Sequence, residues 1–101
     1  MTAYAALAEP HRRQILDMLR EGERPVNELV AGLKLSQPSV SKHLRVLREA
    51  GLVRARPVGK QRWYGLRARP LAEVDAWLEP YRAHWSARLD ALERHLEEES
   101  R

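Results

Sequence analysis

The sequence contains no cysteine, and this absence excludes two kinds of site. A chain without thiols forms no disulfide and holds no metal ion through thiolate ligands. The sequence also has no apolar run near the roughly 18 residues that a membrane-spanning helix needs, and no basic stretch followed by an apolar segment at its start. We therefore expect a cytoplasmic protein that has no membrane partner.

Motifs of the common enzyme classes are missing as well. There is no glycine-rich phosphate loop, and residues 95–99 lack the second histidine of an HExxH zinc-protease motif. No serine, histidine and acidic residue have a spacing that argues for a catalytic triad. The sequence predicts a protein that is not an enzyme and that needs no cofactor.

Positive charge is concentrated in the middle third of the chain. Residues 1–33 carry four basic and five acidic side chains, residues 34–67 carry nine basic and one acidic, and residues 68–101 carry five basic and eight acidic. The middle segment has a net charge of +8, where an ordinary solvated surface would intersperse both signs. Such a concentration favours a nucleic acid as the partner.

The chain of 101 residues has the composition of a compact, globular protein. Residues that start or end helices divide its first half into several predicted helices. A short helix over residues 3–8 ends before Pro10, because the residue before a proline avoids the helical conformation. Pro10 suits the first turn of the next helix, which Gly22 closes. Apolar residues at i, i+3, i+4 and i+7 predict a two-turn helix over residues 26–33.

A second helix follows after a tight connection. Ser36 is a good N-cap for a helix over residues 37–50, and Gly51 ends it. Two short helices joined in this way have the pattern of a helix-turn-helix motif. In the second helix a rotation of 100° per residue places the apolar residues on one side and the polar ones on the other side or the flank.

That helix has the character of a recognition helix, whose first turns meet base edges in a major groove. Glutamine and serine side chains read bases there, and basic side chains reach guanine or phosphates. Taken alone, these basic residues are better interpreted as a solvated helix face, but the segregated charge and the hairpin described next reverse that preference. The expected DNA contacts are Gln37, Pro38, Ser39, Ser41, Lys42 and Arg45, with Arg48 on phosphates.

A β-hairpin is expected directly after this helix. Two short runs rich in Val, Trp, Tyr and Arg flank Gly59-Lys60, which predicts a hairpin over residues 53–66. Pro57 indicates that the first strand lies at an edge or ends early. A hairpin in this position is a wing, and its narrow basic tip suits a phosphate backbone or a minor groove. The wing residues expected to bind DNA are Arg54, Arg56, Lys60 and Arg62.

A long amphipathic helix is predicted from Leu71 onward, and Pro80 should kink it or split it after Leu78. Its apolar stripe exceeds what a body of this size covers, so the second half predicts contact with a second copy. We expect residues 1–68 to form the DNA-binding domain and residues 69–101 a dimerisation helix of the same compact unit. The expected interface residues are Tyr81, Trp85, Leu89, Leu92 and Leu96.

Three segments together resemble one known family. Residues 6–16, 36–53 and 59–66 are similar, in this order, to the opening helix, the recognition helix and the wing of the ArsR-type winged-helix repressors. The resemblance covers about residues 4–67. It implies a mainly helical winged helix-turn-helix fold and a homodimer, with a helical interface, that binds an imperfect palindrome. The contacts that it implies fall on Gln37, Ser39, Ser41, Lys42, Lys60 and Arg62.

The sequence departs from the metal-sensing members of that family. Those members place two cysteines around a valine where this chain has Pro-Val-Asn at residues 25–27, so arsenic or soft-metal sensing there is excluded. A second family site uses histidines and carboxylates of the C-terminal helix, for which His84, His95 and Glu98 are the candidates. Arg82 lies where such a site would need a carboxylate, so we expect these residues to bind no metal. The long C-terminal helix resembles that of the metal-independent branch of the family.

The other two histidines are given plain structural roles. We expect His43 to be a packing residue whose polar atoms are satisfied, and His11 to lie near the surface.

We therefore expect a sequence-specific, double-stranded DNA-binding transcriptional regulator, a homodimeric repressor of a palindromic operator. The alternatives are a zinc-responsive repressor of the same fold that uses the C-terminal histidines, and a winged helix that binds protein or RNA. Steep salt dependence separates duplex binding from an apolar protein interface. The long C-terminal helix is where a small-molecule effector would act, but no residue identifies one.

Overall fold

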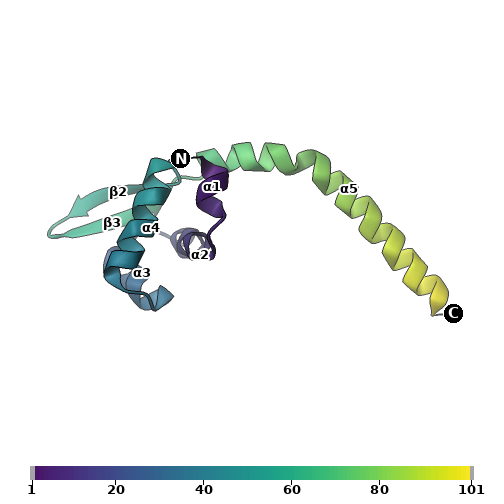
Figure 1. The fold of residues 1–101 in the computed structure, drawn as a ribbon, viewed down its shortest axis with the longest axis horizontal. Helices are drawn as coiled ribbons and strands as arrows, with labels where there is room; N and C mark the ends of the chain where they lie inside the picture. Colours follow the sequence, from purple (N-terminus) through teal and green to yellow (C-terminus); the bar gives the residue numbers. More distant parts are fainter. Residues whose placement is uncertain (1, 101) are drawn as a thin grey trace.

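The computed structural model describes residues 2–100 and consists of a helical body, residues 2–67, and one projecting helix (Figure 1). The expected mainly helical fold with a hairpin wing and a long C-terminal helix is confirmed. The radius of gyration is 18.5 Å, above the roughly 13 Å of a compact domain of about 100 residues, because the last helix extends away from the body. The elements are α1 (Ala3–Leu7), α2 (Pro10–Leu19), β1 (Arg24–Pro25), α3 (Val26–Leu33), α4 (Gln37–Glu49), β2 (Val53–Val58), β3 (Gln61–Leu66) and α5 (Arg69–Glu99).

Side-chain caps fix where three of these helices begin, and the first is Thr2, which accepts from the backbone N–H of Ala5 at 3.2 Å and starts α1. Glu9 accepts a hydrogen bond from the backbone N–H of Arg12 at 3.1 Å and starts α2. Ser36 accepts one from the backbone N–H of Ser39 at 3.3 Å and starts α4, as predicted. Between α3 and α4 the chain turns through Lys34, whose φ of 57° is left-handed. This short turn sets the direction in which α4 leaves α3.

The three strands form an antiparallel sheet in the order β1-β3-β2. β2 and β3 are the expected hairpin, and β2 lies at an edge, as Pro57 predicts. The sequence does not predict β1, in which Arg24 pairs with Tyr64, because a two-residue strand has no alternating pattern to detect. β1 joins the wing to the turn that Gly22 closes after α2.

The hydrophobic core lies between α1 to α4 and the inner face of the sheet. Val53 and Tyr64 contribute the wing's share of the buried residues. Three core residues belong to α4, so the core itself holds that helix in a fixed rotation. The largest fully buried side chains are Ile15, Leu29, Val40, Leu44, Leu47 and Leu52.

α5 packs on the body only through its first turns. Leu71 and Val74 contact the core, and Tyr4 donates a hydrogen bond to the carbonyl of Glu73 at 3.3 Å. The helix then continues through Pro80 without a break and bends partway along its length (Figure 1). Of the two effects expected of Pro80, the structure has the bend and not the split. None of the described helices is long and apolar enough to span a membrane.

Candidate nucleic-acid interface

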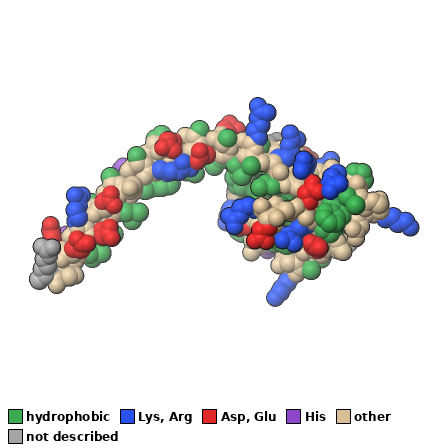
Figure 2. Space-filling model, turned by 180° about the vertical axis from the view of Figure 1, so that it is seen from behind, with side chains coloured by type: hydrophobic (Ala, Val, Ile, Leu, Met, Phe, Trp, Pro, Cys, Tyr) green, Lys and Arg blue, Asp and Glu red, His purple; other side chains and the backbone are tan. Residues whose placement is uncertain are grey.

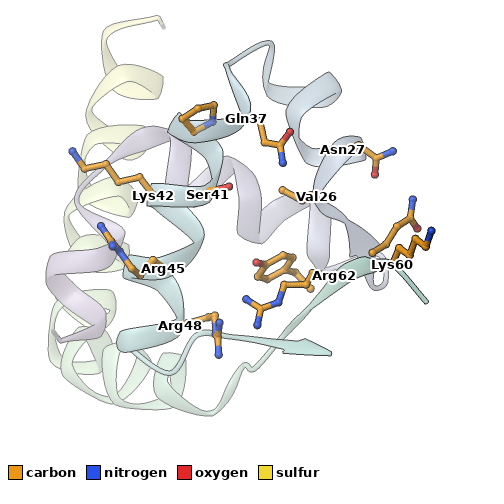
Figure 3. A pocket seen from close by; sticks show the side chains of 12 residues that line it. Val26, Asn27, Gln37, Ser41, Lys42, Arg45, Arg48, Lys60 and Arg62 are labelled. Atoms are coloured by element: carbon orange, nitrogen blue, oxygen red, sulfur yellow. The ribbon is translucent and has the colours of Figure 1, made fainter. Parts of the chain in front are cut away.

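A concave surface lies between α4, the start of α3 and the wing (Figure 3). It encloses about 780 Å³. Its lining comes from the first turn of α3, from one side of α4 and from the hairpin end of the wing. We call the following residues the α4–wing surface: Val26, Asn27, Gln37, Pro38, Ser41, Lys42, Arg45, Arg48, Lys60, Gln61, Arg62 and Tyr64.

The buried side of α4 decides which of its residues reach this surface. Val40, Leu44 and Leu47 are at most 1% exposed, and turning the helix about its axis would pull them out of the core. With the rotation fixed in this way, Gln37 and Ser41 border the concave surface in Figure 3. The division between a buried and a polar side of this helix is confirmed.

Alternation along the strands sorts the wing residues onto two faces. Arg62 is two residues from Tyr64 in β3, so their side chains share a face. Tyr64 is 7% exposed and belongs to the core, and Arg62 therefore lies on the face that is turned toward α4. Arg56 is opposite Trp63 in the register and lies on the other face, which we call the outer face, together with Arg54.

The arginines of the outer face are paired with an acid. Arg54 Nη2 lies 3.2 Å from Oε1 of Glu23, and Arg56 Nη2 lies 2.7 Å from Oε2. The hydrogen bond from Arg56 lowers the pKa of Glu23, so the carboxylate is ionised and neutralises part of this face.

The basic residues of the α4–wing surface, unlike the arginines of the outer face, are not paired with any acid that the structure describes. Within residues 2–100, none of them forms an ion pair with an acidic side chain. Five cations thus share one concave surface with their charges uncompensated by this chain. They are Lys42, Arg45, Arg48, Lys60 and Arg62.

Most of the residues that the sequence assigns to DNA binding meet at this surface. Ser39 does not line it, and its hydroxyl accepts a hydrogen bond from that of Ser36 at 3.0 Å. Arg54 and Arg56 lie on the outer face. A DNA contact for these three residues rests on the sequence prediction alone. The residues that the structure brings together are Gln37, Pro38, Ser41, Lys42, Arg45, Arg48, Lys60 and Arg62.

Asn27 and Gln61 line the same surface, although no sequence pattern assigns them to it. Asn27 lies in the first turn of α3, whose N-cap Pro25 makes no side-chain hydrogen bond. In a helix-turn-helix protein the first helix crosses the DNA backbone while the second enters the groove. A polar residue at the start of α3 is therefore the signal that points to Asn27.

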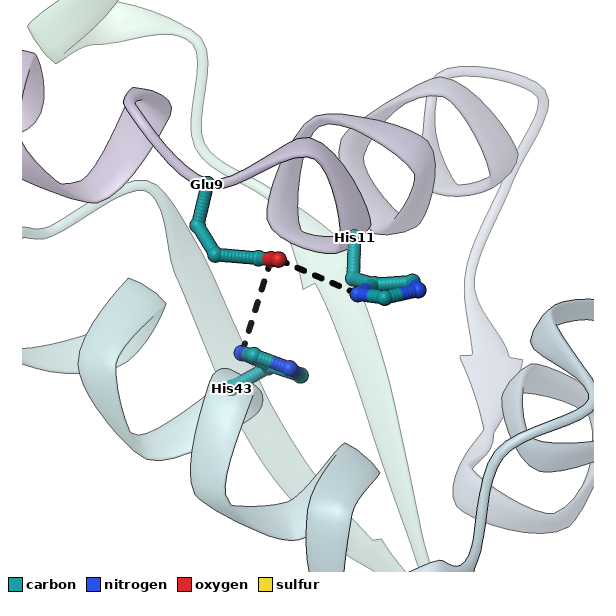
Figure 4. Close-up of side chains that lie close together, drawn as sticks. All are labelled: Glu9, His11 and His43. Carbon is teal, nitrogen blue, oxygen red and sulfur yellow. Dashed lines mark hydrogen bonds and ion pairs between the residues drawn. The ribbon is translucent and has the colours of Figure 1, made fainter.

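The two histidines of the body lie beside Glu9 (Figure 4). His11 is half-buried, and its Nδ1 lies 3.0 Å from Oε1 of Glu9. The side chain of His43 is 17% exposed, and its Nδ1 is buried without a hydrogen-bond partner, 3.8 Å from Oε2 of Glu9. The prediction that the polar atoms of His43 are satisfied is therefore wrong, since only its packing role holds.

The C-terminal histidines are on the exposed part of α5. His95 Nε2 lies 3.1 Å from Oε1 of Glu99. In the described part of a single chain, His84, His95 and Glu98 do not form a group of three potential ligands. The expectation that these residues hold no metal stays a prediction, with a site between two chains as the alternative.

An uncovered apolar stripe runs along α5 (Figure 2). Trp77 begins it, although the sequence prediction omits that residue. The centroid of its ring lies 5.9 Å from that of Tyr4 and 5.2 Å from that of Tyr81. Leucine side chains continue the stripe toward the C-terminus. The predicted interface residues are each 46–64% exposed in the single chain: Tyr81, Trp85, Leu89, Leu92 and Leu96.

Comparison with known proteins gives a consistent result. Residues 9–55 match the family model described as bacterial regulatory protein, arsR family. The chain is 37% identical over 97 residues to the HTH-type transcriptional regulator Rv2034 of Mycobacterium tuberculosis, covering 96% of this chain and 88% of that protein. It is 44% identical over 69 residues to the HTH-type transcriptional repressor SmtB of the same species, covering 68% of this chain and 51% of that protein.

A solved structure agrees with these relatives. The solution NMR structure of the homodimeric winged helix-turn-helix DNA-binding domain of a possible ArsR-family regulator from Mycobacterium bovis aligns with a TM-score of 0.63 at 33% identity. The alignment covers 79% of this chain and 78% of that chain. The fold and the α4–wing surface define a winged helix-turn-helix DNA-binding protein. The chain belongs to the ArsR family of bacterial transcriptional regulators.

Proposed function

We propose that this regulator is a homodimeric repressor that binds a palindromic operator in double-stranded DNA through the α4–wing surface. Residues 1–68 form the DNA-binding domain, and residues 69–101 form the dimerisation helix. The observation that carries the proposal is the set of five basic side chains without an acidic partner in residues 2–100, gathered on one concave surface. The phosphates of a duplex supply the missing negative charge.

The start of α4 enters the major groove in this proposal. Gln37 pairs with the N6 and N7 atoms of an adenine, and Ser41 donates to or accepts from a neighbouring base. Lys42 reaches a guanine or a phosphate. Arg62 and Lys60 on the wing bind phosphates, which fixes the register of the helix without reading sequence. An apolar protein interface would leave these charges uncompensated, whereas the phosphates of a duplex neutralise them.

A second copy of the chain covers the apolar stripe of α5. The stripe includes aromatic and leucine side chains that are about half exposed, which is costly for a monomer in water. The homodimeric relative from Mycobacterium bovis supports this arrangement. In a twofold dimer the two α4 helices enter successive major grooves about 34–36 Å apart, so the operator is an inverted repeat. Occupation of a promoter then blocks the polymerase.

Selection of bound duplexes from a random library tests the proposal. We expect the protein to enrich an inverted repeat whose half-site centres lie about one helical turn apart. Gln37→Ala should lose the preference at one base position of each half-site, worth about 1–3 kcal/mol, and keep the others. Gln14→Ala, the same substitution on the exposed side of α2, is the matched control and should leave the pattern unchanged.

Two outcomes would contradict this account. A selection that enriches no duplex would overturn DNA binding through this surface. An unchanged pattern with Gln37→Ala would remove the role given to that residue.

A further inference from the structure

Three potential metal ligands meet where the start of α2 packs beside α4 (Figure 4). Glu9 and His11 come from the start of α2, and His43 comes from α4. One donor atom of each residue lies within 4.8 Å of the donor atoms of the other two. None of the three lines the α4–wing surface, so the proposed DNA contacts leave this cluster without a role.

We propose that Glu9, His11 and His43 form a binding site for a divalent transition-metal ion of the zinc type, with a fourth position open to water. Zinc binds imidazole nitrogen and carboxylate oxygen at about 2.0–2.2 Å, so the donor atoms of a tetrahedral site lie roughly 3.4 Å apart. The two distances from the carboxylate oxygens to the imidazole Nδ1 atoms are 3.0 Å and 3.8 Å and lie on either side of that value. These distances involve both oxygens of Glu9, and the donor atoms of the three residues all lie within 4.8 Å of one another, so side-chain rotation has to close the remaining gap to ligand spacing.

The state of His43 supports the site independently of these distances. Its Nδ1 is buried and has no hydrogen-bond partner, and a buried polar atom in that condition calls for a ligand. That nitrogen faces the Glu9 carboxylate (Figure 4), so an ion bound between the two would give it the partner that it lacks.

Glu9 has acceptor positions left. Its Oε1 lies beside His11, and its Oε2 accepts from the Arg12 backbone N–H and lies beside His43. Capping α2 uses one of the roughly four acceptor positions of a carboxylate. Glu9 therefore binds an ion without giving up its place at the start of the helix.

The guanidinium group of Arg12 makes its hydrogen bonds outside this cluster. Arg12 Nε donates to the carbonyl of Ala6 at 2.6 Å, and its Nη2 donates to the carbonyl of Ala5 at 3.3 Å. Both acceptors belong to α1, so the cation is bonded away from the three ligand atoms. An ion here would join the start of α2 to α4, and any effect on DNA rests on the proposed function, whereas the site itself does not.

Titration of the metal-free full chain with Zn²⁺, in competition with a chromophoric chelator and without DNA, tests the proposal. We expect one Zn²⁺ per chain and an affinity at least about tenfold weaker in His11→Ala and in His43→Asn. His11 is half-exposed, so its variant keeps the test valid if the His43 variant folds poorly, which circular dichroism checks. The double variant His84→Ala/His95→Ala is the matched control and should bind Zn²⁺ like the parent.

Each result decides the matter. Absence of Zn²⁺ binding at micromolar concentration would overturn the site, and so would binding that disappears in the control and persists in His11→Ala. Because no DNA is present, a negative result leaves the proposed operator binding untouched.

Discussion

The body and α5 are each incomplete, and they are incomplete in opposite ways (Figure 2). The body buries its apolar residues but leaves the cations of the α4–wing surface without acidic partners among the residues described. α5 pairs Arg82 with Asp75 and Glu79 but buries none of its own residues. The body therefore lacks a polyanionic partner, whereas α5 lacks a partner with an apolar surface that would cover its stripe. A single partner cannot meet both needs. DNA therefore binds the body, and a second copy of the chain binds α5.

The largest expected effect comes from disrupting the apolar stripe of α5. Leu89→Glu places a charge in the stripe of α5, where Leu89 is 64% exposed in the single chain. We expect the dimer to dissociate, and operator affinity to fall about a hundredfold or more, because each half-site is then bound separately. Light scattering and DNA titration measure the two effects.

A control variant separates the stripe from the helix as a whole. Ala87→Glu adds the same charge on the opposite side of α5 and should leave both mass and affinity unchanged. A Leu89→Glu protein that stays dimeric would show that the stripe is not the interface.

The next effect comes from removing charge at the wing. Lys60→Ala/Arg62→Ala should lower affinity for every DNA sequence by about tenfold or more and flatten the log–log salt slope by roughly 1.8 per chain. Arg54→Ala/Arg56→Ala removes the same number of charges from the outer face, where Glu23 already pairs them, and should cost much less. Titrations between low and moderate salt give both slopes. Equal losses in the two variants would show that both faces of the wing touch DNA.

The smallest effect sharpens the difference between the two faces of the wing. Glu23→Gln should free Arg54 and Arg56 and raise affinity for non-specific duplexes by less than about tenfold, with a steeper salt slope. Glu21→Gln, which loosens an exposed pair with Arg24, is the control. Unchanged or weaker non-specific binding in Glu23→Gln would contradict the view that this carboxylate restrains the two arginines.

Local patterns were sufficient for the elements and for the rotation of the recognition helix. The spacing of Val40, Leu44 and Leu47 alone fixes which side of α4 is buried. The glycine-containing turn and the flanking β-prone residues likewise predict the hairpin, and its register follows from the turn. These features depend on residues that are close in the sequence, so sequence reasoning reaches them.

Features that depend on distant residues were not predictable in the same way. Glu23 is 31 and 33 residues from the arginines that it binds, so the sequence shows four wing cations and cannot show that two of them are paired. The unpartnered Nδ1 of His43 depends likewise on where the start of α2 comes to lie. Trp77 was missed for a different reason, because Leu78 competes with it for the same place in the apolar spacing.

The most direct test of the central claim is a map of backbone amide shifts when the labelled protein is titrated with its selected duplex. The account predicts that the largest shifts fall on residues 37–48 and 60–62, with small changes at Arg54 and Arg56. Shifts that concentrate on the outer face of the wing or on α5, with residues 37–48 unchanged, would contradict it.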